Sequence, residues 1–321
     1  ISCSASSTST AITLNLGGTL TLDNSTTAVA DRLGNALALT MNGGNFNFIG
    51  NSAGASSETT GALTLATGHN IVTVTPGSGG STSMTFASIS RTAGATVLLR
   101  GTSLGGTPGA HVSTLIITSG AYTGGGGADN TATKSIIKGA FGDNSLSGTG
   151  TDMVTLGANG LRLLNSLGFS GEYASDFQTA NANVKLTADT APVATNTNSL
   201  ILNGYNITNP GGAITLPISS ATLAGNILIN SATNIAGANT TLGITNFEVQ
   251  ILATANSTIS AKIGTAVAGI LTLSGPGNVT LSAANLYTGV TYINGATLTY
   301  GTSNAISSGG VTVVGGIYDL N

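Results

Sequence analysis

Short stretches in which hydrophobic residues alternate with threonine or asparagine recur along the whole chain. In the N-terminal third they lie at residues 12–16, 20–23, 37–41, 46–49, 63–65, 71–74 and 97–99. Alternation with a period of two is typical of a β-strand that has one buried face. Glycine, asparagine or serine separates the stretches, so the sequence predicts many short strands joined by turns.

The phrase Gly-x-Leu-Thr-Leu recurs at irregular intervals, at residues 18–22, 61–65 and 269–273, with a related phrase at 295–300. Short strands with frequent turns are found in β-sandwiches and barrels as well as in β-solenoids. Aromatic residues make up 4% of the chain and tryptophan is absent, whereas a closed sandwich core of this size normally contains large rings. We therefore favour a solenoid, whose interior is only one or two aliphatic side chains wide.

The middle of the chain has a different composition. Ten of the nineteen Asp, Glu, Lys and Arg residues lie between Asp129 and Asp189, and four glycines at 124–127 precede them. Residues 172–180 form the best helical candidate, with Ser170 placed to cap its first turn. We interpret this segment as an elaboration between two solenoid halves or a bulge from one face.

The most specific motif lies near the C-terminus, in residues 271–298. It resembles the autotransporter-associated β-strand repeat, whose pattern is Gly-x-Gly-x-Leu-x-Leu-Ser-Gly-x-Asn-x-Tyr-Thr-Gly-x-Thr-x-Ile-x-x-Gly-x-Leu. The residues that match in register are Gly275, Gly277, Leu281, Ser282, Asn285, Tyr287, Thr288, Gly289, Thr291, Ile293, Gly295 and Leu298. Val279, Ala283 and Ala284 depart from the pattern, but each keeps a small or apolar side chain.

The resemblance implies a right-handed parallel β-helix that is secreted or displayed on a bacterial cell surface, and it brings no catalytic residue. The predicted fold is thus an all-β solenoid with an irregular insertion around residues 111–192. We expect an N-terminal solenoid part at 1–110, the insertion or connecting segment at 111–192, and a C-terminal solenoid part at 193–321 with the repeat at 271–301. Tyr287 is expected to stack at a turn and not to bind a ligand.

Residues for catalysis are sparse. His69 and His111 lie at turn-like boundaries between strands, and we expect both to be solvated. An enzyme acting on polysaccharides would need converging acidic groups. The candidates for such a site are Asp143, Asp152, Glu172 and Asp176, with Arg162 and Lys138 near them in sequence. We interpret these charges as structural or solvated, and we predict no enzyme activity, catalytic residue, metal site or cofactor.

Charge and hydrophobicity limit the partners of the chain. The net charge is −3 and the eight Lys and Arg residues are scattered, which argues against binding to nucleic acid. No apolar run is long enough to span a membrane. The single cysteine, Cys3, lacks an internal partner and could pair between subunits. It lies in a Ser/Thr-rich tail, residues 1–10, that could also insert into a neighbouring subunit as a strand.

The function predicted first is a building block of an extracellular filament, sheath or surface layer. The chain stops within a strand phrase, residues 318–321, without a polar cap. We therefore expect a homo-oligomer or head-to-tail polymer formed by stacking of open ends. The alternative is an adhesin or glycan-binding passenger domain that contacts glycans or a neighbouring or host cell through residues 129–189. A third hypothesis, a polysaccharide lyase or hydrolase, would depend on Asp152 or Glu172.

Overall fold

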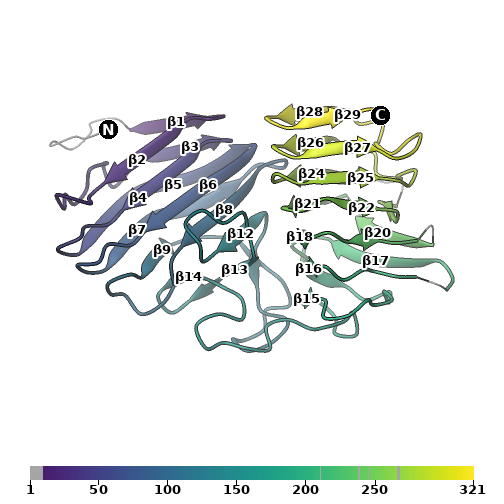
Figure 1. Ribbon diagram of the computed structural model, residues 1–321, viewed down its shortest axis with the longest axis horizontal. Coiled ribbons are helices and arrows are strands. Elements are labelled where there is room, and N and C mark those ends of the chain that lie inside the picture. The colour runs from purple at the N-terminus through teal and green to yellow at the C-terminus, as the bar shows by residue number, and fades with distance from the viewer. Residues whose placement is uncertain (1–9, 210, 238, 245, 266–267) are drawn as a thin grey trace. The chain divides into compact units, whose positions relative to one another are not determined.

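The computed structural model describes residues 10–209, 211–237, 239–244, 246–265 and 268–321. These residues form strands, turns and bends, with no helix among them, which confirms the prediction of an all-β chain (Figure 1). They divide into two compact units. Unit 1 contains the described residues up to Ala121 together with Ala140–Gly168, and unit 2 contains Tyr122–Gly139 and Phe169–Asn321. The predictions for Cys3 and for the tail up to residue 9 lie outside the described residues.

Unit 1 has two sheets. Sheet A contains, in spatial order, β1 (Ala11–Asn15), β3 (Ala38–Asn42), β5 (Ser56–Thr67), β7 (Thr82–Arg91) and β9 (Ser113–Ile117). Sheet B contains β14 (Gly160–Leu163), β13 (Asp152–Gly157), β12 (Ala140–Asp143), β8 (Thr96–Gly101), β6 (His69–Thr75), β4 (Asn45–Ile49) and β2 (Thr19–Asp23). From β1 to β9 the chain enters the two sheets alternately, so neighbours within a sheet are parallel. Only β13 and β14 add antiparallel pairs.

The register in unit 1 places like residues above one another. Leu14 pairs with Met41, and Met41 pairs with Leu65, so three apolar side chains follow one another into the interior. The next column, Thr13–Thr40, lies on the outer face. This is the arrangement that the alternation of apolar residues and threonine predicts, because successive side chains of a strand point to opposite faces.

Unit 2 has three parallel sheets and a short antiparallel pair, β10 (Tyr122–Thr123) with β11 (Ile136–Ile137). Sheet C contains β15 (Ala182–Lys185), β16 (Thr197–Asn203), β18 (Asn226–Ser231), β21 (Glu248–Ala253), β24 (Ile270–Ser274), β26 (Thr291–Asn294) and β28 (Val311–Val314). Sheet D contains β17 (Ile214–Ser219), β20 (Thr240–Ile244) and β23 (Lys262–Ile263). Sheet E contains β19 (Asn234–Ile235), β22 (Ser257–Ile259), β25 (Asn278–Leu281), β27 (Thr297–Tyr300) and β29 (Ile317–Asp319).

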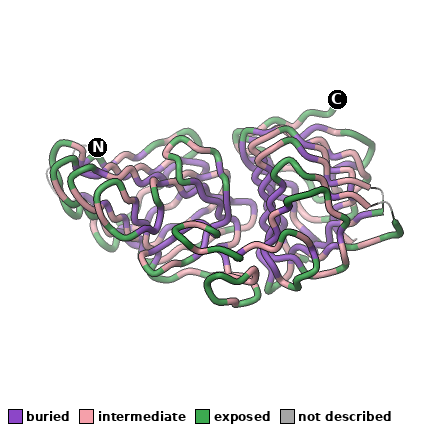
Figure 2. Tube along the Cα trace, turned by 60° about the horizontal axis from the view of Figure 1, so that its bottom comes forward, coloured by how far each residue is buried: buried purple, intermediate pink, exposed green. Residues whose placement is uncertain are grey.

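From β18 to β24 the chain visits sheets C, E and D in turn, and the strands of sheet C recur every 20 to 22 residues from residue 226 to residue 311. Buried residues follow the strands and exposed residues gather in the turns (Figure 2). The core of this unit is mostly aliphatic, and its two fully buried rings are Phe177 and Tyr287. Tyr287 is therefore a core residue, and its hydroxyl bonds the hydroxyl of Thr291 at 2.7 Å.

Two glycines of the repeat motif show why the pattern requires them. Gly275 has a φ of 96°, and a Cβ there would also lie 2.4 Å from the carbonyl oxygen of Ala253 in the preceding coil. Gly289 would bring a Cβ to 2.4 Å from the carbonyl oxygen of Gly269. Both positions need glycine because a side chain would either strain the backbone or separate two coils.

The helix predicted for residues 172–180 is wrong. Ala174 instead forms an isolated parallel bridge with Val184. Its amide donates to the carbonyl of Asn183 and its carbonyl accepts from the amide of Lys185. Ser170 therefore has no helix to cap, and its amide donates to the side chain of Asn130. Pairing with β15 thus satisfies backbone groups that a helix would have bonded locally.

The segment predicted to be an insertion, residues 111–192, is shared between the units. Residues 111–121 and 140–168 belong to unit 1, and the rest belongs to unit 2. The chain therefore passes from unit 1 into unit 2 at residue 122, returns at residue 140 and leaves again at residue 169. The division into three parts stays a prediction.

Candidate functional site

The acidic residues proposed for a polysaccharide-cleaving site fall into different units. Asp143, Asp152 and Arg162 belong to unit 1, whereas Glu172 and Asp176 belong to unit 2. Lys138, also in unit 2, places its ammonium group 5.9 Å from the centre of the Phe247 ring.

In unit 1, both acidic candidates, Asp143 and Asp152, bond backbone amides close to them in sequence. The buried carboxylate of Asp143 accepts from the amides of Ser145 and Gly150, at 2.8 and 3.0 Å, and so holds the loop after β12. Asp152 accepts from the amide of Met153. Arg162 is buried and donates to the carbonyl of Leu163 at 3.1 Å. These contacts support the interpretation of Asp143 as a structural charge.

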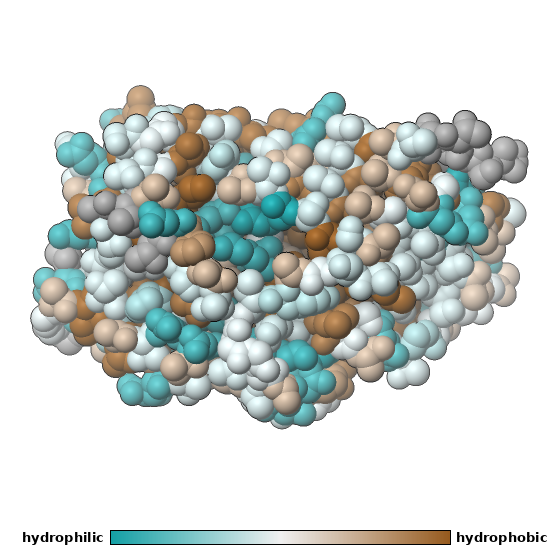
Figure 3. Space-filling view, turned by 180° about the vertical axis from the view of Figure 1, so that it is seen from behind, coloured by the Kyte–Doolittle hydropathy of each residue, from teal (hydrophilic) through white to brown (hydrophobic). Residues whose placement is uncertain are grey.

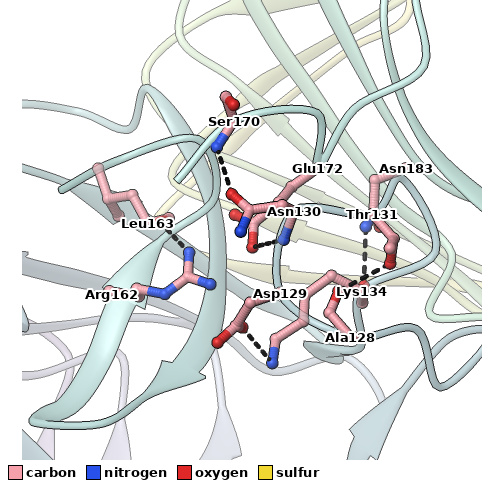
Figure 4. Close-up of polar contacts among 10 residues, drawn as sticks. All are labelled: Ala128, Asp129, Asn130, Thr131, Lys134, Arg162, Leu163, Ser170, Glu172 and Asn183. Atoms are coloured by element: carbon pink, nitrogen blue, oxygen red, sulfur yellow. Dashed lines mark hydrogen bonds and ion pairs between the residues drawn. The ribbon is translucent and has the colours of Figure 1, made fainter. Parts of the chain in front are cut away.

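In unit 2, Glu172 positions a loop. Its carboxylate is fully buried and accepts from the amide of Asn130 at 3.3 Å, and the side chain of Asn130 accepts from the amide of Ser170 at 2.9 Å (Figure 4). Asp176, half-buried, accepts from the amide of Gln178. Glu172, which the sequence placed among the candidates for catalysis, therefore positions the backbone of a loop.

The loop that Glu172 holds belongs to residues 122–139, which we call the arm. Both ends of the arm continue into unit 1, but the arm itself packs on unit 2. Its tip, residues 125–131, is largely exposed to solvent. The ammonium group of Lys134 pairs with the carboxylate of Asp129 in the tip at 2.8 Å, and the Asp129 side chain is 42% exposed. An ion pair this accessible contributes at most about 1 kcal/mol, so other contacts must hold the arm.

Asn183 supplies the first of these contacts. It lies on β15 and is fully buried. Its side-chain amide donates to the carbonyl of Lys134 at 2.8 Å (Figure 4). Its backbone amide donates to the carbonyl of Ala132 at 2.7 Å. Its side-chain oxygen accepts from Asn198 at 2.9 Å and from the hydroxyl of Ser199 at 2.8 Å. One side chain thus ties the arm to two strands of sheet C.

Two further buried asparagines continue this anchor. Asn198, just inside β16, donates to the carbonyl of Thr123 at 3.2 Å. Asn226, the first residue of β18, accepts from the amide of Gly139 at 2.8 Å and donates to the carbonyl of Ile137 at 3.2 Å. An asparagine side chain suits this task because it offers both a donor and an acceptor to the backbone of the arm.

Exposed aromatic rings would support glycan contact through residues 129–189, but none of the four rings of this segment is an exposed platform. Phe141 and Phe177 are buried. Phe169 and Tyr173 are half-buried, and the ammonium group of Lys185 lies 5.5 Å from the centre of the Tyr173 ring. The rings of this segment therefore give no support to glycan contact.

The two histidines differ from each other. His111 is exposed in a turn, as predicted. His69 begins β6 and is half-buried, and its Nδ1 lies 2.9 Å from the hydroxyl of Thr96, so the prediction of a solvated ring is wrong there. Burial of the ring, with Arg100 nearby, lowers the pKa of His69 to about 4. The imidazole is therefore neutral near pH 7 and serves as a hydrogen-bonding group between two coils.

Within the described ranges, no three His, Cys, Asp or Glu side chains lie close enough together to hold a metal ion. The same part of the chain contains no helix with the length and hydrophobicity of a membrane span. The predicted absence of catalytic residues and cofactors stays a prediction.

Sequence reasoning missed the anchoring asparagines. Asn198 and Asn226 stand beside strand phrases that the alternation does identify, but their partners lie 75 and 89 residues away. No local pattern marks such distant contacts. The nearest signal is that a strongly polar residue occupies a strand otherwise formed by apolar residues.

Comparison with known proteins gives one informative similarity. The chain is 29% identical over 294 residues to the adhesin BmaC autotransporter of Brucella suis biovar 1 (strain 1330). The match covers 88% of this chain and 8% of that protein. No protein-family model and no solved structure matches the chain significantly. The similarity agrees with the resemblance to autotransporter surface proteins seen in the sequence, whereas the type of repeat stays a prediction.

Proposed function

We propose that the chain is part of the passenger region of an autotransporter-type adhesin on a bacterial surface or outside the cell. Each unit is then a right-handed parallel β-helix, and the stacked coils serve as a stiff support for exposed loops. The observation that carries this proposal is the arm. The polar tip, residues 125–131, is exposed to solvent, while buried Glu172 bonds the amide of Asn130 near its end and buried Asn183 holds Lys134 just after it.

A fixed base matters for binding because a loop that is already ordered loses less conformational entropy when a partner docks. Contacting residues on many proteins lie on loops that a rigid scaffold positions. The similarity over 88% of the chain to a protein described as an adhesin supports the same function. Glycans or the surface of a neighbouring or host cell are the partners we propose.

Adhesion of coated beads tests this function. Beads coated with the chain are expected to bind a monolayer of cultured epithelial cells more strongly than albumin-coated beads. A variant in which a Gly/Ser linker of equal length replaces residues 125–131 should bind less. If the intact chain binds no better than albumin, the adhesin function is refuted. If both forms of the chain bind equally, the arm is not the contact surface.

The other functions predicted from the sequence gain less support. The similarity to an adhesin does not support a filament building block, so stacking of subunits and homo-oligomer formation stay predictions. The adhesin described above is not an enzyme by its name, which weakly favours the expectation of no catalysis. Among the acidic candidates of a lyase or hydrolase, Asp143 and Asp176 bond backbone amides in their own loops, and Glu172 bonds a backbone amide of the arm.

A further inference from the structure

A shallow groove crosses sheet E of unit 2. Its volume is about 310 Å³, at the low end of the range of about 300–1,000 Å³ that is typical of sites for small ligands. Six polar residues line it, namely Thr233, Asn256, Ser257, Thr258, Asn278 and Thr280. They come from three successive coils, at or beside β19, β22 and β25. The groove therefore runs across the strands, in the direction in which the coils stack.

The lining of the groove is polar but carries no charge. Hydroxyl and carboxamide groups provide all of its side-chain polarity, and one alanine completes it. A phosphate, sulfate or carboxylate ligand would lack a cation here, and a cationic ligand would lack a carboxylate. Figure 3 shows one face of the molecule, which is mostly white, with teal and brown in patches. These observations favour a neutral polar ligand.

Several of these groups have bonding capacity left for a ligand. Asn256 uses its side-chain oxygen to accept from the amide of Asn278, and Asn278 uses its own to accept from the hydroxyl of Thr299. These bonds leave both side-chain NH2 groups as donors. In the part of the chain that the structure describes, the hydroxyls of Thr258 and Thr280 bond no protein atom. The groove thus offers both donors and acceptors to a ligand.

Ser257 borders the groove without facing it. It precedes Thr258 on β22 and pairs in register with buried Val279, so its side chain points into the core and away from the groove. Its hydroxyl is buried and has no hydrogen-bond partner among the described residues. A ligand in the groove would therefore meet Thr258 and Thr280, which point outward.

The spacing of the groups narrows the class of ligand. Thr258 and Thr280 are paired in register on adjacent strands, and adjacent strands lie about 4.8 Å apart. Pyranose units of an extended, β-linked oligosaccharide repeat on a similar scale and present hydroxyls at each unit. A hydroxyl-rich ligand of this kind would meet one threonine on each coil.

We propose that this groove binds a neutral, extended oligosaccharide, with Thr258, Thr280, Asn256 and Asn278 contacting successive sugar units. The inference rests on the proposed adhesin function and names the class of ligand that such a protein would recognise. It concerns a surface separate from the arm.

A glycan array tests the proposal, with the fluorescently labelled chain as the probe and with neutral, sialylated and sulfated oligosaccharides as targets. The double variant Thr258→Val and Thr280→Val removes two hydroxyls but keeps the β-branched shape that the strands favour. The matched control is Thr13→Val with Thr40→Val, which changes a paired outer column of sheet A in unit 1. Thermal unfolding of both variants shows that the fold is retained.

We expect binding to neutral oligosaccharides only, with affinity lowered about tenfold or more in the Thr258/Thr280 variant, since each lost hydrogen bond contributes about 1 kcal/mol. The Thr13/Thr40 control should bind like the unchanged chain. Binding confined to charged glycans, equal binding by both variants, or no binding to neutral glycans would overturn the proposal. If coated beads adhere to cells while neutral glycans are not bound, the groove proposal alone fails. If glycans are bound but beads do not adhere, the adhesin function fails and the groove stands.

Discussion

Replacement of Asn183 by alanine should release the arm from unit 2. The side chain of Asn183 is fully buried and makes three hydrogen bonds, to the carbonyl of Lys134, to the amide group of Asn198 and to the hydroxyl of Ser199. The carbonyl of Lys134 would lose this donor. Asn198 would keep its bond to the carbonyl of Thr123, so the middle of the arm should be affected more than its beginning.

The magnitude follows from these bonds. A buried hydrogen bond contributes a net of about 1 kcal/mol, and buried groups left without a partner add to its loss. Of the three bonds, only the one to the carbonyl of Lys134 joins the arm, because the other two lie within sheet C. About 1 kcal/mol therefore falls on local opening of the arm, and the open fraction rises roughly fivefold, because about 1.4 kcal/mol is a factor of ten.

Limited proteolysis with trypsin measures this opening, since Lys134 lies within the arm. When opening and closing are fast relative to cleavage, the rate of cleavage follows the open fraction. Cleavage after Lys134 should accelerate by a similar factor in Asn183→Ala. The matched control is Asn42→Ala, which removes one exposed hydrogen bond to Asn15 in unit 1. Equal cleavage rates after Lys134 in Asn183→Ala and the unchanged chain would refute the anchoring role.

Two further predictions concern pH. Burial raises the pKa of Glu58 above its usual 4.5, so its contribution to the free energy of unfolding decreases as pH rises through the raised pKa. Glu58→Gln should therefore gain stability relative to the unchanged chain as pH rises above 4.5, and parallel curves from urea denaturation would contradict this. The pKa of His69 is lowered from 6.5 to about 4. The free energy of unfolding should therefore decrease as pH falls through this window, and NMR titration of the ring should give a midpoint near 4.

The strands were predictable because their signal is local. Leu14, Met41 and Leu65 each stand in an alternating stretch, and the same alternation places them in one inward column. The glycines of the motif were predictable for a similar reason. Gly275 lies at a corner with a positive φ, and glycine adopts this backbone conformation more readily than other residues. The all-β class can thus be predicted from the local pattern of each short segment.

The prediction of a helix at 172–180 was wrong because pairing with β15 outweighed the local helix propensity. Ala174 lies among residues that tolerate a helix, yet its amide and carbonyl bond β15. Glu172 looked like a charge for the first helical turn, whereas its carboxylate is buried beneath the arm and bonds the amide of Asn130. Both outcomes depend on contacts more than eight residues away in sequence, which a periodicity cannot reveal.

Asparagines of unit 2 have two different roles, which depend on where they lie: some hold the backbone of the arm and others border the groove. Asn198 and Asn226 are buried beside sheet C, where backbone groups of the arm use their side-chain amides. Asn256 and Asn278 border the groove on sheet E, where their side-chain oxygens bond the protein and their NH2 groups remain available as donors. Because the residue type is the same in both places, composition cannot separate structural asparagines from binding ones. The free hydrogen-bonding groups of the groove, and not its polarity, are therefore what distinguish it as a ligand site.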